Sequence, residues 1–225
     1  MLMRCVVARF SMLLAAHHSH LAWLIYARQQ RYAFASQEDA LADVAARCLA
    51  FRAAHPRGLV LVGAYSIGKE RVALAAAAAL RCGVYCEAAR ARTYACFRWA
   101  ELDAVMTRDS GATPLHIVPI AWLNGAKLRA YLARHPRHDA LLALRPTGWT
   151  HTDGSSRRAA SASARDGRVQ LQGVPYSEHS SAEELRAFLR LLRPRRVVPT
   201  VGVGSPEKRE AMTRLIDGWL AERDG

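Results

Sequence analysis

One histidine, His179, stands among hydroxyl-bearing residues where a strand is expected to give way to a helix. Residues 169–174 predict a short strand, and residues 182–192 predict an amphipathic helix. The start of this helix offers two candidate N-caps and two capping-box acids, Ser180, Ser181, Glu183 and Glu184. A helix N-terminus favours an anion, and an adjacent imidazole can hold a metal. The alternative is an ordinary loop histidine.

A glycine-rich turn is the second chemical candidate. Gly63 and Gly68, followed by Lys69, have the spacing of a nucleotide-binding P-loop between a strand and a helix. The next position must be Ser or Thr to ligate magnesium, but here it is Glu70, which would repel phosphates. No strand that ends in an aspartate follows. The sequence therefore disfavours a P-loop NTPase, and a tight turn with a solvated Lys69 is the structural alternative.

Four segments, taken in their order and spacing, resemble one family: residues 61–72, 142–151, 175–181 and 197–201. The strings Tyr-Ser-Ile-Gly-Lys-Glu and Arg-Pro-Thr-Gly-Trp-Thr are long and specific. They resemble the DNA interstrand cross-link repair nucleases of the metallo-β-lactamase/β-CASP superfamily, relatives of Artemis. The resemblance runs from about residue 31 to about residue 219 and covers the C-terminal half of the family's catalytic region. These strings favour the DNA-repair branch over an RNA-processing β-CASP nuclease.

The resemblance implies roles for particular residues. His179 corresponds to the late histidine that completes the metal site of the family. His116 resembles a β-CASP histidine near the metals, and a core histidine on a strand is its alternative. Trp149 either stacks on a base or plugs the core. The residues expected to contact nucleic acid or phosphate are Tyr65, Ser66, Lys69, Arg145, Thr147, Ser177 and Ser180.

For intact relatives the resemblance implies zinc and a metal-dependent 5′-to-3′ DNA exonuclease that trims cross-linked or damaged ends in the nucleus. Metal-assisted hydrolysis lowers the pKa of water, and catalytic zinc needs about three protein ligands. The family's His-x-His-x-Asp-His motif and first acidic β-CASP motif should precede Tyr32, but residues 1–37 contain no acidic residue. His18 and His20 have His-x-His spacing without the Asp-His that should follow. We therefore expect neither stoichiometric zinc nor nuclease activity from this chain alone.

Composition points to an anionic partner. The 225 residues carry a net charge of +13, mostly from arginine, which favours nucleic acid as a partner. The alternative is an arginine-rich genome. A nucleic-acid-binding module without catalysis is the alternative function. Five cysteines show neither a disulfide pattern nor zinc-ribbon spacing, which is typical of reduced thiols in an intracellular protein.

Alternating strands and helices predict an α/β fold. We expect a non-matching leader at 1–35, which could instead be a transit peptide but not a membrane span, a β-CASP-like segment at 36–139, and the C-terminal part of a metallo-β-lactamase αββα sandwich at 140–225. The N-terminal half of the sandwich is expected to be missing.

The predicted strands are 59–62, 84–85 as an edge, 115–118, 140–144, 169–174 and 196–199. The predicted helices are 36–51, 70–81, 87–97, 101–106, 124–133, 182–192 and 207–222, and 154–168 is predicted as an exposed loop. Leu142, Leu144, Val197 and Val198 should lose burial, so we expect self-association or a protein partner on that face.

Overall fold

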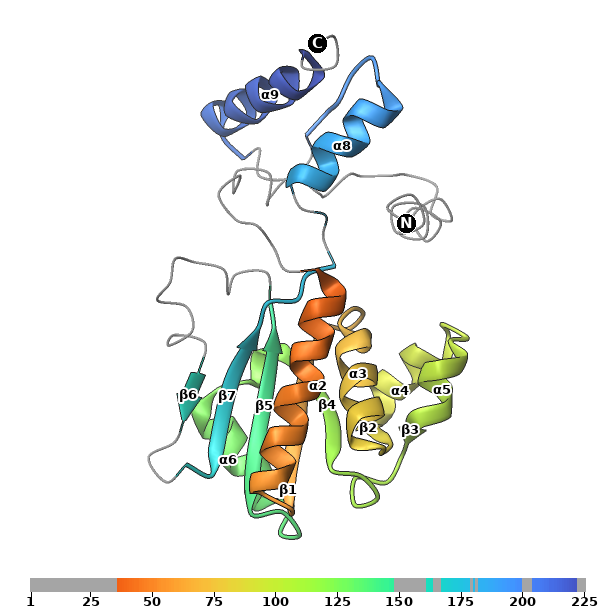
Figure 1. Ribbon diagram of the computed structural model, residues 1–225, viewed down its shortest axis with the longest axis vertical. Helices are drawn as coiled ribbons and strands as arrows, with labels where there is room; N and C mark the ends of the chain where they lie inside the picture. The colour runs from red at the N-terminus through yellow and green to blue at the C-terminus, as the bar shows by residue number, and fades with distance from the viewer. Residues whose placement is uncertain are drawn as a thin grey trace. The chain divides into compact units, whose positions relative to one another are not determined.

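The computed structural model describes residues 36–147, 161–163, 167–178, 180, 182–199 and 204–221. The described residues form two compact units, one that ends at Glu178 and one that lies beyond it. Figure 1 shows the first unit as a sheet covered by helices and the second as a pair of helices.

The first unit is built on a sheet whose described strands follow the order β3-β2-β4-β1-β5-β7-β6. The strands are β1 (Gly58–Ala64), β2 (Val84–Cys86), β3 (Met106–Thr107), β4 (Leu115–Pro119), β5 (Ala140–Pro146), β6 (Ser161–Ser163) and β7 (Val169–Val174). Neighbouring strands are parallel except β6 and β7, which are antiparallel. β1 is buried along its whole length, as expected of a parallel strand covered on both faces.

Helices cover both faces of this sheet. They are α2 (Gln37–Ala54), α3 (Glu70–Leu80), α4 (Ala88–Ala95), α5 (Ala100–Val105), the 3-10 turn η1 (Ile120–Trp122) and α6 (Gly125–Ala133). Figure 1 shows α2 and α3 in front of the strands and α6 behind them. Val60 and Val62 pack with α2 and α3, whereas Leu59 and Leu61 pack with α6. Alternate side chains of β1 thus belong to two hydrophobic cores, one on each face of the sheet.

Ser36 and Asp39 cap the N-terminus of α2. The Ser36 hydroxyl accepts a hydrogen bond from the Asp39 amide at 3.0 Å and donates one to the Asp39 carboxylate at 2.8 Å. A serine in this position satisfies an amide that the helix itself leaves unpaired.

The second unit contains α8 (Ala182–Leu192) and α9 (Pro206–Ala221). Met212, Ile216 and Trp219 of α9 form its buried cluster, against which Leu185 and Val197 pack. Residues 196–199 were predicted as a strand, but they have no regular structure and Val198 is exposed. Val197 instead packs beside the helices, because no strand of this unit among its described residues offers a pairing edge.

The α/β fold expected from the sequence is confirmed, and the remaining elements agree with their predicted positions to within a few residues. β2 is not an edge strand, because the short β3 pairs with its outer side. Part of the predicted 154–168 loop forms β6. The sheet also continues across the boundary expected after residue 139, since β5 pairs with β1.

The expected exposure of the β5 leucines is wrong. Leu142 and Leu144 are fully buried, because β5 lies between β1 and β7 and its leucines pack beneath the helices of the first core. Among the described helices, none is long and apolar enough to cross a membrane.

Candidate functional site

Most of the candidate nucleic-acid residues follow strands β1, β5 and β7, at the carboxyl edge of the sheet. The pairs Ala64↔Pro119 and Pro146↔Val174 bring the ends of β1, β4, β5 and β7 to this edge. Open parallel sheets bind ligands at the carboxyl ends of their strands. The polar loop residues therefore lie at the edge of the sheet where α/β domains bind ligands. Ser180 belongs to the second unit.

The turn after β1 has the backbone of an anion-binding loop. Gly68 and Lys69 both have positive φ, +104° and +77°, and each of their amides donates to a carboxylate. The Gly68 amide donates to the Glu70 carboxylate at 2.7 Å, and the Lys69 amide donates to the Glu178 carboxylate at 2.8 Å. Carboxylates of the chain itself thus occupy the amides that a P-loop would offer to phosphate, which opposes the NTPase interpretation.

Lys69 is an internal cation. Its side chain is 6% exposed, and Nζ donates to the Tyr176 carbonyl at 3.3 Å and lies 5.2 Å from the Tyr176 ring centroid. Burial lowers the pKa of Lys69, while the charges of Glu178 and Glu70 act in the opposite direction. Lys69 is therefore neither the solvated lysine nor the groove-facing lysine that the sequence predicted, because its ammonium group is turned toward the exit of β7.

The exit of β7 is held at three successive residues. Lys69 binds the Tyr176 carbonyl and, through its amide, the Glu178 carboxylate. Gln37 Nε2 donates to the Ser177 carbonyl at 2.6 Å, and Arg71 donates to Gln37 Oε1 at 2.9 Å. We call this set of contacts the β7 clamp. It fixes the chain immediately before His179, which itself lies outside the described residues.

Tyr65 and Ile67 project from the same loop and are exposed by 57% and 59%. Arg90 of α4 donates to the Tyr65 carbonyl and, at 3.2 Å, to the Tyr94 hydroxyl. The exposed Ser66 lies between the two apolar side chains. An exposed aromatic ring on a loop that a guanidinium group fixes can stack on a nucleobase.

Arg145 and Thr147 lie at the end of β5 and are half-buried. Arg145 Nη2 donates to the Leu123 carbonyl, and the Thr147 amide donates to the Val174 carbonyl at 2.9 Å. Arginine has five N–H donors, so one bond to Leu123 leaves Arg145 able to contact an anion as well. Two other residues of this segment, Trp149 and His151, fall outside the described residues.

His116 is a fully buried core residue. Its Nε2 lies 3.0 Å from the Ser110 carbonyl and 3.2 Å from the Thr113 carbonyl, while Nδ1 lies 2.9 Å from the Tyr131 hydroxyl. Because carbonyls only accept hydrogen bonds, Nε2 carries the proton and Nδ1 accepts from Tyr131. This leaves no imidazole lone pair for a metal, so the geometry favours the core-histidine alternative over a place beside metals.

The metal ligands implied by the resemblance are not gathered in the described part of the chain. There, no three His, Cys, Asp or Glu side chains lie close enough to hold a metal ion. His18 and His20 lie outside the described residues, as His179 does. The side chains that the structure describes therefore do not fit a metal by themselves, and we assign no chemical step to one.

Sequence reasoning missed Glu178 and Gln37, which build the β7 clamp. The turn itself was recognisable from Gly63, Gly68 and Lys69, but Glu178, which accepts from the Lys69 amide, lies 109 residues further along the chain. Only the parallel order of β1, β5 and β7 brings these residues together.

The fold and site define a parallel α/β domain with a carboxyl-edge surface that combines an exposed aromatic side chain with arginine. Comparison with known proteins narrows this class. The sequence profile of the DNA repair metallo-beta-lactamase family matches residues 100–205. The chain belongs to this family, as the resemblance of its motifs implied.

The relatives include DNA cross-link repair proteins and a 5′ exonuclease. The chain is 39% identical to the DNA cross-link repair protein SNM1 of Arabidopsis thaliana, over 84% of this chain and 40% of that protein. It is 33% identical to the human DNA cross-link repair 1A protein, over 85% of this chain and 18% of that protein. It is 32% identical to the 5′ exonuclease Apollo of Gallus gallus, over 65% of this chain and 28% of that protein. The chain thus spans at most 40% of these relatives.

Proposed function

We propose that this chain supplies the nucleic-acid-binding, C-terminal part of a nuclear DNA-repair nuclease that digests damaged or cross-linked DNA from the 5′ end. Family membership supports this proposal, as does the name of one relative, a 5′ exonuclease. The net charge of +13 favours a polyanionic substrate.

The observation that carries the proposal is the β7 clamp. It holds residues 176–178, which follow β7, beside the loop that follows β1 and exposes Tyr65. A metal-assisted nuclease must hold its metal ligands at a fixed position relative to the surface that binds the DNA strand. The clamp would fix the chain relative to this surface as far as Glu178, the residue before His179.

Zinc, and His179 as one of its ligands, are part of the proposal. They rest on the match between His179 and the late histidine of the family, and on the family's description as metallo-beta-lactamase. The division of the chain into a leader at 1–35, a β-CASP segment at 36–139 and a sandwich segment at 140–225 belongs to the same proposal.

Binding of single-stranded DNA tests the carboxyl-edge surface. If a base stacks on Tyr65, Tyr65→Ala should remove about 1–3 kcal/mol, which raises Kd about 5- to 150-fold. Leu49 on α2 is exposed by 51%, so Leu49→Ala is a matched control that removes a similar exposed apolar side chain elsewhere. Fluorescence anisotropy with a labelled oligonucleotide measures both. Equal Kd values for the two variants would refute the assignment of this surface.

The alternative is a module that binds nucleic acid at the same surface without cleaving it. The net charge of +13 favours this alternative, because electrostatic binding to phosphates requires no metal. Incubation with 5′-phosphorylated DNA, Zn²⁺ and a relative's metal-binding segment separates the two functions. Metal-dependent release of nucleotides supports the nuclease. Tyr65-dependent binding without release, even after a relative's metal-binding segment is supplied, supports the module.

A further inference from the structure

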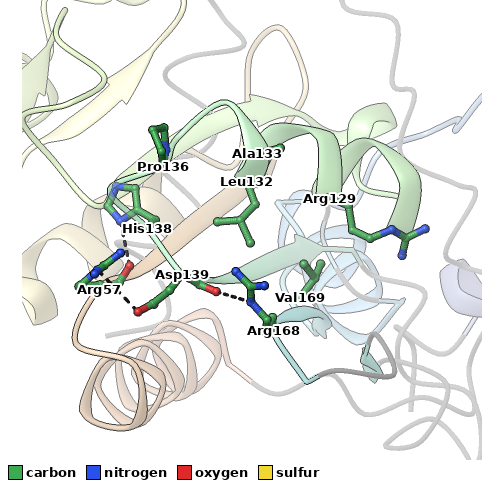
Figure 2. A pocket seen from close by; sticks show the side chains of 9 residues that line it. All are labelled: Arg57, Arg129, Leu132, Ala133, Pro136, His138, Asp139, Arg168 and Val169. Carbon is green, nitrogen blue, oxygen red and sulfur yellow. Dashed lines mark hydrogen bonds and ion pairs between the residues drawn. The ribbon is translucent and has the colours of Figure 1, made fainter.

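A second candidate site lies at the opposite edge of the sheet. A cavity of about 390 Å³ opens where Arg57, Asp139 and Arg168 immediately precede β1, β5 and β7. Arg129 and Leu132 of α6 form another wall. Figure 2 shows Arg57, Asp139 and Arg168 joined by hydrogen bonds and an ion pair, with Arg129 on the other side of the pocket in this view. β1 is seven residues long, so the two edges lie roughly 20 Å apart.

Positive charge dominates this pocket. Three arginines line it with one carboxylate, Asp139, whose Oδ2 lies 3.6 Å from Arg57 Nε. Arg129 is exposed and forms no hydrogen bond or ion pair with the part of the chain that the structure describes. No Asp or Glu occurs between Asp109 and Asp139, whereas that stretch also contains Lys127, Arg134 and Arg137. The segment that contains α6 therefore adds positive charge and, before Asp139, no carboxylate.

Backbone contacts hold the charged rim in place. Arg168 Nε donates to the Asp139 carbonyl at 2.9 Å, and Arg57 Nε lies 3.2 Å from the Arg137 carbonyl. The His138 ring bonds the Arg57 carbonyl at 3.0 Å. Side chains that are ordered before an anion arrives lose less conformational entropy when it binds.

The lining also contains an apolar part. Leu132 and Val169 are buried in the core formed with α6, and their side chains reach the cavity. The C-terminal carbonyls of α6 would repel an anion, but the Tyr131 and Leu132 carbonyls already accept hydrogen bonds from the amides of Arg134 and His135. Cations beside a small apolar wall suit a phosphate together with its sugar.

We propose that this pocket, which we call the α6 pocket, binds the sugar-phosphate backbone of a single nucleic-acid strand, with Arg129 as a phosphate contact. The pocket is open to solvent, so a strand can reach it from outside the fold. It forms a second contact for nucleic acid, separate from the carboxyl edge, and it does not depend on the proposed nuclease activity.

Salt dependence of binding tests the proposal with the full chain and a short fluorescein-labelled oligothymidylate. Loss of one phosphate contact in Arg129→Gln should reduce the slope of log Kobs against log salt by about 0.7. Arg129→Lys keeps the charge and should keep the slope. Lys127→Gln removes the same charge from the same helix at an exposed position that does not line the pocket, and it should leave the slope nearly unchanged.

Equal loss of slope in Arg129→Gln and Lys127→Gln would overturn the proposal, because it would indicate a diffuse basic surface. Titration with inorganic phosphate tests the small-ion alternative. If Arg129→Gln abolishes phosphate binding but leaves the DNA slope intact, the pocket takes a free anion and the proposal fails. If DNA binding is weakened by Arg129→Gln but not by Tyr65→Ala, the result contradicts the proposed function and supports this inference.

Discussion

The buried His116 should make the sheet unit sensitive to mild acid. Burial, and secondarily the nearby His135, lowers the pKa of His116 from its ordinary 6.5 to about 4. The unfolded chain therefore binds a proton between these pH values while the folded chain does not, so stability falls as pH decreases from 6.5 toward 4. The difference between a pKa of 6.5 and one of about 4 corresponds to at most about 3.4 kcal/mol, at 1.36 kcal/mol per pKa unit.

Urea unfolding at several pH values, followed by circular dichroism, measures this slope directly. His116→Gln should flatten the dependence between pH 4 and 6.5, although it also lowers stability at neutral pH because contacts to Tyr131 and Ser110 change. His135 lies 5.1 Å from the His116 ring, and its pKa is also lowered by burial, so a small slope should remain. His55→Gln, outside this cluster, should keep the full slope. An unchanged slope in His116→Gln would refute the assignment of His116 as a neutral core residue.

Two further predictions concern the β7 clamp and His179. Lys69→Met removes a buried hydrogen bond to the Tyr176 carbonyl and should cost about 1.5–3 kcal/mol in urea unfolding, whereas Lys127→Met at an exposed position should change stability by less than about 0.5 kcal/mol. Glu178→Ala should speed hydrogen exchange at the Lys69 amide while Glu178→Gln, which keeps an acceptor, protects it partly; equal exchange in both would argue against the clamp. Elemental analysis should find no stoichiometric zinc in the chain alone, and supplying a relative's metal-binding segment should allow exonuclease activity that His179→Ala abolishes. Zinc-dependent activity of the chain alone would contradict this expectation.

Local pattern predicted much of the fold because local physics determines it. The run of apolar residues in β1 and the start of α2, which Ser36 caps, each depend on neighbours a few positions away. The errors arose where non-local pairing decides the outcome. β3 is two residues long and exists as a strand because β2 is beside it, and residues 196–199 have the composition of a strand but no partner in the described part of their unit.

The candidate site was predictable in position but not in its internal chemistry. Motif spacing brought Tyr65, Arg145 and Ser177 to strand ends that a parallel sheet aligns at one edge. What each residue does there depends on burial, which the spacing does not reveal.

Lys69 illustrates this difference between position and role. A lysine after a glycine-rich turn is expected to meet phosphate, but in this turn Glu178 and Glu70 supply the negative charge from within the chain. With those carboxylates in place, the positive charge of Lys69 is balanced inside the fold and its ammonium group is free to bind the Tyr176 carbonyl. The turn therefore fixes the segment that leads to His179, and the proposed contact with DNA is assigned to residues that remain exposed, Tyr65 first among them.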